Sequence, residues 1–427
     1  MHTEFKAPWV AVVALPAGGR SPAEGRKYHG DGRDVLLQGF HWRSHAGAFD
    51  HASRSQKSWY KIIQENAAAI QAAGFTWVWF PPPSDSLASQ GYIPRRWHVL
   101  DSAYGAEAEL RAAIAALGPV KAMADVVLNH RVGVHTSGAD FADPPFPDNR
   151  AAIARDDESG VGTGNPDTGE RHPAGRDLDH TNPGVREAIK TYLRGLKSAG
   201  FKGWRYDLVK GYHGGFVGEY NDATGPAFSV GECFDGDRQK VTQWIDAAGG
   251  KSTAFDFPTR YLLYDATAGD DYGRLRSVNG GRVVPGGLIG YWPSRSVTFL
   301  DNHDTEHCRE GDYYYQNNPT RHFTGKMAEI GYAYLMTHPG NPCVFWSHFF
   351  DWGEPLRRHI DRLIKVRKYA GVHAGSHVDI KEAGKGLYAA IIDGRAAVKL
   401  GSRGWHPGGG WQLAADGDGF AVWTRGG

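Results

Sequence analysis

Residues 203–207 read Gly-Trp-Arg-Tyr-Asp, a largely apolar run that ends on a carboxylate. Three further segments repeat it: DVVLNH at residues 125–130, Gly231-Glu232, and FLDNHD at residues 299–304. Each one supplies ionisable side chains at the point where a β-strand would stop. In a barrel of parallel strands the carboxyl ends share one face, so side chains distant in sequence converge there. We therefore predict an active site at that face.

Eight short apolar runs alternate with helical stretches from residue 34 onward, which is the pattern of βα units around a parallel sheet. The runs are residues 35–40, 76–80, 120–128, 203–207, 228–232, 253–257, 296–300 and 343–346. They are apolar almost throughout, which suits strands that are buried on both faces. Apolar residues at helical spacing lie between them, in helices that we expect to open at Ser58 and to run through Leu110 and Val185. The predicted fold class is α/β, a (β/α)8 TIM barrel.

Two segments depart from this alternation. Residues 129–182 are rich in Gly, Pro, Asp and His with almost no periodicity, which predicts a small inserted domain after the third strand. After a final helix at about residues 355–370, short runs punctuated by glycine predict a C-terminal antiparallel β domain over residues 371–427. The barrel would then comprise residues 31–128 and 183–370.

Composition limits the partners. The formal net charge of +1 supplies no field to attract nucleic acid or an anionic membrane, so we expect a neutral partner. We also expect a monomer. No stretch approaches the ~20 continuous apolar residues that span a bilayer. Residues 9–17 form a short apolar run that ends in Leu-Pro-Ala, a weak match to a secretion signal. This match favours a secreted or extracytoplasmic protein, and an intracellular protein remains the alternative. We expect residues 1–30 to be a targeting or disordered segment.

The three cysteines, Cys233, Cys308 and Cys343, lack CxxC spacing. A disulfide framework or a zinc site is therefore not expected, and one bridge is the maximum. The favoured interpretation is that they are small buried residues.

Arg205 and Asp207 lie two residues apart in one predicted strand, so both side chains point to the same face of the sheet. A guanidinium beside a carboxylate favours the ionised form and lowers the pKa of that carboxylate. Asp207 would then be available as a nucleophile near neutral pH. A purely structural ion pair explains these two residues equally well when they are taken alone.

Glu232 closes the next predicted strand, where partial burial would raise its pKa and hold a proton for a leaving group. Two carboxyl groups about 5 to 5.5 Å apart give double displacement at a sugar with retention, and a wider gap gives inversion. The sequence leaves both open. A solvated strand end also explains Glu232 by itself.

Asp304 and His303 follow the seventh predicted strand, and His130 follows the third, so all three join the same rim. Imidazoles can donate hydrogen bonds to sugar hydroxyls, and a third carboxylate can stabilise positive charge on a sugar ring. Each residue has a structural alternative, because His130 could cap a turn and Asp304 could cap the following helix. Their joint placement at strand ends favours a shared site.

These segments resemble those of the α-amylase family of retaining α-glucan hydrolases, and the resemblance spans nearly the whole chain. It runs from LLQGF at residues 36–40 to FAVW at residues 420–423. Plant-type enzymes are similar at PPPS (81–84), GYIP (91–94), DLDH (177–180) and GYWP (290–293), and bacterial maltotetraose-forming amylases at YHG (28–30) and WSH (346–348). The resemblance implies endo-hydrolysis of α-1,4-glucosidic bonds in starch. The alternatives are an exo-acting amylase or a transglycosylase with the same catalytic residues, and a non-catalytic glucan-binding protein.

The resemblance also implies a role for each matching residue. It makes Asp207 the nucleophile, Glu232 the general acid/base and Asp304 the stabiliser of the transition state. The implied substrate-binding residues are Arg205, His130, His303, Lys210 and Tyr92, the last as a stacking platform under the sugar at the cleavage point. Tyr291 with Trp292, and Tyr388, match surface starch-binding positions of plant enzymes, although a buried aromatic is an equal alternative for Tyr388. Phe234 departs from the Trp common in plant enzymes at that position.

One structural calcium ion is implied as well. Its oxygen-only shell would comprise the side chains of Asn129, Asp167 and Asp177 and the carbonyl oxygens of Glu170 and Gly211. Plant enzymes carry further calcium ions, but here the loop is shorter before Asp156, and Arg171 stands where a carboxylate would be expected. We therefore expect a single Ca²⁺ that ties the inserted loop to the barrel.

Overall fold

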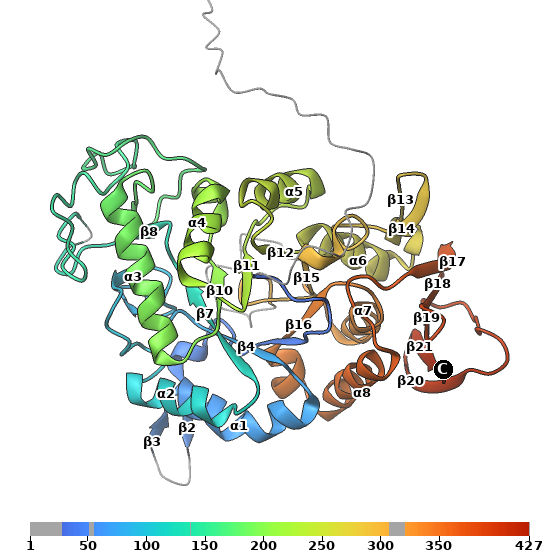
Figure 1. The fold of residues 1–427 in the computed structure, drawn as a ribbon. Helices are drawn as coiled ribbons and strands as arrows, with labels where there is room; N and C mark the ends of the chain where they lie inside the picture. The colour runs from blue at the N-terminus through green and yellow to red at the C-terminus, as the bar shows by residue number, and fades with distance from the viewer. Residues whose placement is uncertain (1–27, 51–54, 137, 307–320, 427) are drawn as a thin grey trace, which may run out of the picture.

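The computed structural model describes residues 28–50, 55–136, 138–306 and 321–426 (Figure 1). Eight parallel strands close into a barrel in sequence order, and the last strand pairs with the first. The strands are β1 (Leu36–Gln38), β4 (Trp77–Phe80), β7 (Lys121–Val126), β10 (Gly203–Tyr206), β11 (Phe228–Gly231), β12 (Thr253–Phe255), β15 (Ser296–Phe299) and β16 (Asn341–Phe345). Each lies in or overlaps one of the eight apolar runs, so the predicted barrel is confirmed.

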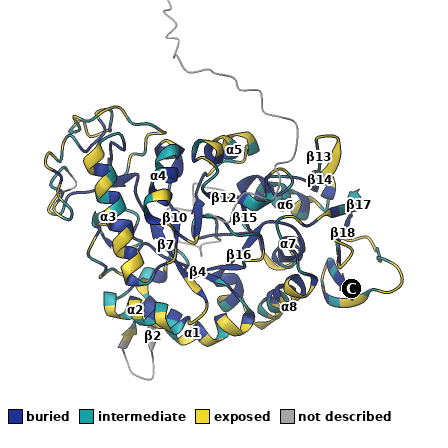
Figure 2. Ribbon diagram, in the orientation of Figure 1, coloured by how far each residue is buried: buried dark blue, intermediate teal, exposed yellow. Residues whose placement is uncertain are grey.

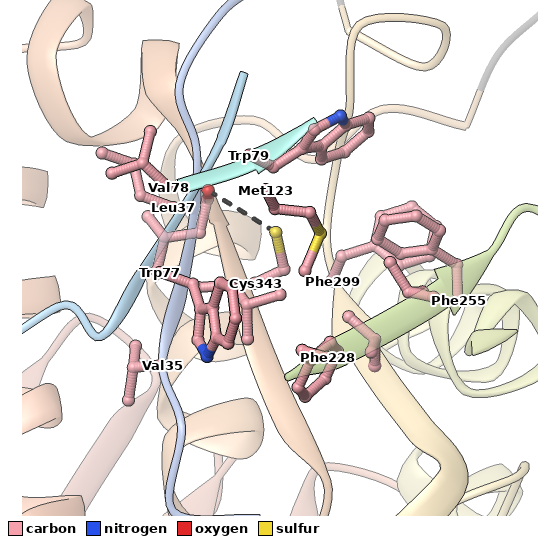
Figure 3. Close-up of a cluster of buried hydrophobic side chains, with 14 of the residues drawn as sticks. Val35, Leu37, Trp77, Val78, Trp79, Met123, Phe228, Phe255, Phe299 and Cys343 are labelled. Atoms are coloured by element: carbon pink, nitrogen blue, oxygen red, sulfur yellow. Dashed lines mark hydrogen bonds between the residues drawn. The ribbon is translucent and has the colours of Figure 1, made fainter. Parts of the chain in front are cut away.

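The interior of the barrel is filled by large apolar side chains. Trp77, Met123, Phe228, Phe299 and Cys343 are all buried and belong to one cluster (Figure 3). The ring of Trp77 lies 5.6 Å from that of Phe228, centroid to centroid. Filling of this kind makes the barrel a packed core, so chemistry is restricted to its ends.

Eight α-helices surround the strands in the described part of the chain, and most of them have a buried inner face and an exposed outer face (Figure 2). They are α1 (Trp59–Ala73), α2 (Glu107–Ala116), α3 (Pro183–Ala199), α4 (Gly214–Thr224), α5 (Arg238–Ala247), α6 (Phe257–Gly269), α7 (Gly325–Thr337) and α8 (Glu354–Ala370). The side chain of Ser58 caps α1 by accepting a hydrogen bond from the backbone N–H of Lys61. The predicted start of this helix is therefore confirmed.

Short two-stranded antiparallel pairs lie outside the barrel sheet. The two-stranded pairs are β2 (Ala48–Asp50) with β3 (Ser55–Lys57), β5 (Asp85–Ser86) with β6 (Pro94–Arg96), β8 (His130–Arg131) with β9 (Arg176–Asp177), and β13 (Arg276–Asn279) with β14 (Arg282–Pro285). The β8–β9 pair joins the two ends of the long connection between β7 and α3. Loops make up almost all the rest of that connection, as its lack of periodicity predicted.

The C-terminal part is a five-stranded antiparallel sheet in the order β17-β18-β19-β21-β20. Its strands are β17 (Val378–Gly384), β18 (Leu387–Ile392), β19 (Ala396–Leu400), β20 (Gln412–Gly417) and β21 (Phe420–Thr424). The sheet packs against α7 and α8 (Figure 1). The antiparallel arrangement confirms the prediction for this end of the chain.

Cys233 and Cys343 are buried free thiols, as expected, whereas Cys308 lies outside the described residues. Residues 1–27, which include the apolar run at residues 9–17, also lie outside them. Within the described ranges, no helix combines the length and the apolar character needed to cross a bilayer.

Candidate active site

Arg205 stands at the centre of a cluster of carboxylates at the carboxyl ends of the strands. Its side chain is fully buried, and its Nη1 lies 2.8 Å from Oδ1 of Asp125 and 2.7 Å from Oδ1 of Asp207. Its Nη2 lies 2.6 Å from Oε1 of Glu232. These acids belong to or directly follow β7, β10 and β11, which are neighbours in the barrel. One guanidinium therefore holds three carboxyl groups together.

The backbone turns sharply after Asp207. Leu208 adopts a left-handed conformation, with φ 43° and ψ 51°, that side chains other than glycine seldom adopt. Its N–H donates a hydrogen bond of 3.2 Å to Oε2 of Glu232, which ties the strand end of Asp207 to Glu232. Strain of this kind persists only where the surrounding structure determines it.

Glu232 is held in conditions that favour its protonated form. Burial raises its pKa well above the ordinary value, and the negative charges of Asp207 and Asp304 raise it further. The positive charge of Arg205 opposes this rise without cancelling it. The arrangement therefore supplies a carboxylic acid with a proton to donate.

His303 and Asp304 lie on the same rim, where the chain leaves β15. Nε2 of His303 is 3.3 Å from Oδ2 of Asp304, whose side chain is 34% exposed and thus open to a ligand. Burial and the charge of Arg205 keep the pKa of His303 well below its usual value, so this imidazole is neutral. Its Nδ1 lies 3.0 Å from Nε2 of Gln38, a residue of β1.

Tyr92 presents its ring beside these groups. The ring is nearly parallel to that of His303, at 5.1 Å and 8°. Its hydroxyl donates a hydrogen bond of 2.9 Å to Oδ2 of Asp125, which fixes the orientation of the ring. His130 supports Tyr92 from behind, because its Nε2 lies 2.8 Å from the Tyr92 carbonyl oxygen. Burial lowers the pKa of His130 to about 4, so it is neutral as well.

Two members of this cluster received no role from the sequence. Asp125 is fully buried and is bonded to Arg205, Tyr92 and Nε1 of Trp79. The sequence contained a signal for Asp125, because this residue opens the DVVLNH segment. In the structure, Asp125 lies directly opposite Arg205 on the neighbouring strand. Gln38 had no such signal, because a glutamine in an apolar strand has no characteristic partner.

The other predicted substrate-binding residues lie farther out. Lys210 is half-buried, and its Nζ lies 3.1 Å from Glu170 and 3.5 Å from Asp235. Tyr291 is 37% exposed, with the guanidinium of Arg238 at 4.9 Å from the centre of its ring, whereas Trp292 is 9% exposed. Within that pair, therefore, Tyr291 is the one open to a surface ligand.

Tyr388 requires a correction. The sequence matched it to a surface sugar-binding position, but it is fully buried at the junction of the barrel and the C-terminal sheet. Its hydroxyl lies 2.7 Å from Nε2 of His338, and Nδ1 of His338 lies 2.9 Å from the Tyr334 carbonyl oxygen. Tyr388 packs two parts of the molecule together and offers no face to a saccharide.

The predicted metal-binding residues lie near one another where the inserted segment meets the turn after Asp207. Nδ2 of Asn129 donates a hydrogen bond of 2.9 Å to Oδ1 of Asp177, and Gly211 packs against the Asn129 side-chain oxygen. The N–H of Glu170 donates to the Lys210 carbonyl oxygen at 2.8 Å, which draws its loop onto the same turn. Burial raises the pKa of Asp167 to about 6 and that of Asp177 to about 7.

These residues fit a hard cation. Oδ2 of Asp167 is buried without a hydrogen-bond partner, and the charge of Asp167 also raises the pKa of Asp177. Ca²⁺ prefers oxygen ligands, and carboxylates whose negative charge is not balanced by a neighbouring cation suit it best. Asp177 further forms a group with Asp157 and Glu158, whose ligand atoms lie within 4.8 Å of one another. Arg171 lies 3.7 Å from Asp156, so its cation already compensates that carboxylate.

Comparison with known proteins gives a consistent result. Residues 369–424 match the family described as the alpha-amylase C-terminal beta-sheet domain. The chain is 38% identical to "Probable alpha-amylase 2" of Arabidopsis thaliana, over 92% of this chain and 95% of that protein. It is 31% identical to the "Glucan 1,4-alpha-maltotetraohydrolase" of Roseateles saccharophilus, over 91% of this chain and 71% of that protein.

A solved structure shows the same fold. The α-amylase from Malbranchea cinnamomea superposes with a TM-score of 0.67 at 19% sequence identity, over 92% of this chain and 97% of that one. Both kinds of relative that the motifs of the sequence suggested, plant-type and maltotetraose-forming, are thus present among the matches.

Proposed function

The chain belongs to the α-amylase family of glycoside hydrolases, and we propose that it cleaves internal α-1,4-glucosidic bonds of starch and related α-glucans with retention of configuration. The observation that carries this proposal is the sharing of Arg205 by Asp207 and Glu232. Contacts to one guanidinium keep the two carboxyl groups close, and a short separation is the arrangement of retaining enzymes.

In the first step, the carboxylate of Asp207 attacks the anomeric carbon while Glu232 gives its proton to the departing glycosidic oxygen. The carbon–oxygen bond breaks, and a glycosyl ester forms on Asp207. The raised pKa of Glu232 serves this step, because the acid must still carry its proton when substrate binds.

In the second step, the Glu232 carboxylate takes a proton from water, and the resulting hydroxide attacks the glycosyl ester. The ester bond breaks, Asp207 regains its negative charge, and Glu232 is again protonated.

Asp304 stabilises the positive charge that develops on the sugar ring in both steps. His303 donates a hydrogen bond to a sugar hydroxyl, and the ring of Tyr92 lies under the sugar.

We propose Ca²⁺ as the resident ion, bound by Asn129, Asp167, Asp177, Glu170 and Gly211. Bound there, the ion supplies structural stability alone. It ties the inserted segment to the turn after Asp207, since Gly211 belongs to the short helix at Val209–Gly211 that follows this residue. The chemistry stays with the carboxylates.

Incubation with soluble starch tests the function. We expect reducing sugar to appear, products of mixed length early in the reaction, and α-configured new ends by proton NMR. One dominant short product from the start would instead identify an exo-acting enzyme, the activity named for the 31% identical relative. Binding of starch without release of reducing sugar would reject catalysis.

A further inference from the structure

The turn at residues 301–306, after β15, contains a buried carboxylate besides the more open one of Asp304. It belongs to Asp301, whose Oδ1 lies 2.7 Å from Nη2 of Arg260 and accepts a hydrogen bond of 3.1 Å from the Thr305 hydroxyl. Its Oδ2 accepts a hydrogen bond of 2.8 Å from the N–H of Phe323. A buried charge is costly unless it is paired and hydrogen-bonded, and both conditions are met here. None of the roles described above uses Asp301.

Arg260 reaches this turn from α6. Its side chain is also buried, and its guanidinium donates to the carbonyl oxygens of Leu300 and Arg321 in addition to Asp301. The planar guanidinium presents several N–H groups in a fixed fork, so it can serve these acceptors at once. A lysine ammonium is a compact point charge on a flexible stem and cannot reproduce that fork. Arg260 therefore attaches the turn to the helix that follows β12.

The hydrogen bonds of Thr305 connect this attachment to Asp304. The Thr305 hydroxyl donates its proton to Asp301, so its lone pairs are left to accept. It accepts a hydrogen bond of 3.0 Å from the N–H of Asn302. The side-chain oxygen of Asn302 in turn accepts from the N–H groups of Asp304 and Thr305, both at 3.0 Å. The backbone of Asp304 is thus held by a chain of hydrogen bonds that begins at Arg260.

A second buried arginine offers a comparison with a purely structural role. Arg367 of α8 is as deeply buried as Arg260 and donates to the carbonyl oxygens of His338 and Gly340, at 2.7 and 2.6 Å. These two residues precede β16, so Arg367 lies at the amino end of the strands, away from the catalytic cluster. Arg260 instead lies at the carboxyl end, where the proposed reaction takes place. The two arginines therefore form a matched pair for experiment.

We propose that Arg260 and Asp301 are positioning residues for Asp304, and that together they hold the turn so that the Asp304 carboxylate faces the sugar ring at the bond that is cleaved. The inference rests on the proposed function, because that function gives Asp304 its role in stabilising positive charge. Neither positioning residue touches the sugar. Their contribution is geometric, and a displacement of about 1 Å in an active site can lower the rate about 100-fold.

Arg260→Lys tests the proposal, with Arg367→Lys as its matched control. Each variant keeps the positive charge and loses the fork, so both should lower the melting temperature. Only Arg260→Lys should lower kcat on soluble starch, by about tenfold, with KM within about twofold of the original value, because a displaced Asp304 affects the transition state rather than the bound substrate. A normal kcat in Arg260→Lys, or an equal fall in Arg367→Lys, overturns the proposal.

A second comparison repeats both substitutions in protein that carries Asp304→Asn. Residues that act as one unit have strongly non-additive effects on kcat. Because Arg260 acts through Asp304, Arg260→Lys should cause a further loss of no more than about twofold in this background. Arg367→Lys should remain without effect on kcat. A further loss of about tenfold from Arg260→Lys would show an effect independent of Asp304 and would overturn the proposal.

Hydrogen exchange at the N–H groups of Asp304 and Thr305 provides a measurement that needs no turnover. Their protection should decrease about tenfold in Arg260→Lys and stay unchanged in Arg367→Lys. Thr305→Val, which removes the hydroxyl and retains the ion pair, gives the same test if Arg260→Lys does not fold. Unchanged protection in the folded variant overturns the proposal. An unmodified protein that does not hydrolyse starch rejects the proposed function instead, and the exchange data still decide whether Arg260 holds the turn.

Discussion

Gln38 and His303 are 265 positions apart in the chain, yet Nε2 of the amide lies 3.0 Å from Nδ1 of the imidazole inside the barrel. On its other side, Nε2 of His303 faces a carboxylate oxygen of Asp304 at 3.3 Å. The amide nitrogen of Gln38 can only donate, so Nδ1 of His303 is the acceptor. In the neutral ring the proton is then on Nε2, the nitrogen on the side of Asp304. Gln38 thus fixes the tautomer of His303.

Replacing Gln38 with Glu should disturb this tautomer. The new carboxylate attracts a proton to Nδ1, which raises the pKa of His303 and favours a doubly protonated ring. We expect kcat to fall about tenfold, with a ¹⁵N NMR signal from His303 that changes from a neutral to a cationic form. Gln38→Met, which removes the donor without adding charge, should leave the ring neutral. An unchanged ¹⁵N signal in Gln38→Glu would contradict the assignment.

Asp207→Asn and Glu232→Gln should each abolish turnover. Loss of a nucleophile or of its partner acid commonly costs about 10⁴-fold or more in kcat. The neutral amide of Glu232→Gln resembles the protonated acid, so the fold and the affinity for glucan should be retained. Starch assays, circular dichroism and titration with maltoheptaose check the three statements. Activity within tenfold of the original enzyme in either variant would reject the roles proposed for these residues.

The pH dependence of kcat/KM should reflect the raised pKa of Glu232. A glutamic acid has an ordinary pKa of about 4.3, and a raised value keeps the proton in place above that pH. Activity should therefore persist well above pH 4.3 and decline as the pH rises through the raised pKa. A profile from pH 4 to 9 measures this decline. A midpoint of the alkaline decline near 4.3 would show that the carboxyl is not perturbed as described.

Chelation should lower the melting temperature and the activity together. A ligand present at about 100 times its Kd stabilises the native state by about 2.7 kcal/mol, and removing the ligand lowers the free energy of unfolding by the same amount. Asp167→Asn, which removes one proposed ligand, should make the melting temperature much less sensitive to chelator. Scanning calorimetry with EDTA, followed by added Ca²⁺ or Mg²⁺, makes the measurement. Identical melting curves with and without chelator would exclude a structural calcium ion.

Tyr388 and Tyr291 should respond differently to substitution. Tyr388→Phe leaves Nε2 of the buried His338 without a donor, which should cost about 1 to 2 kcal/mol of stability with no change in starch binding. Tyr291→Ala removes an exposed ring and should weaken adsorption to starch granules with little change in stability. Thermal denaturation and a granule-binding assay separate these effects. Normal adsorption by Tyr291→Ala would remove the proposed surface site.

The strands were predictable because burial on both faces leaves a continuous apolar run, and these runs are short and alternate with amphipathic helical stretches. The strand ends carried the acids for the same reason, since polar residues interrupt a buried run only where it reaches the surface. Residues 203–207 show both signals at once. The convergence of Asp207 and Glu232 then followed from the topology of the barrel alone.

Other features depended on contacts that a sequence does not display. The bond between Gln38 and His303 joins β1 to the segment after β15, and no local pattern marks Gln38 as a partner of this histidine. Tyr388 lies in a strand where alternation does not show which face meets the barrel, so a buried tyrosine and an exposed one look alike.

The closing contact of the barrel joins Leu36 of β1 to Cys343 of β16. During synthesis on the ribosome, β1 must therefore wait for most of the chain to emerge before it acquires this neighbour. Pairing over such a separation carries a large entropic cost and comes late in folding. Gln38 reaches His303 only in the completed barrel, so nascent or truncated chains should be unable to act on glucan prematurely.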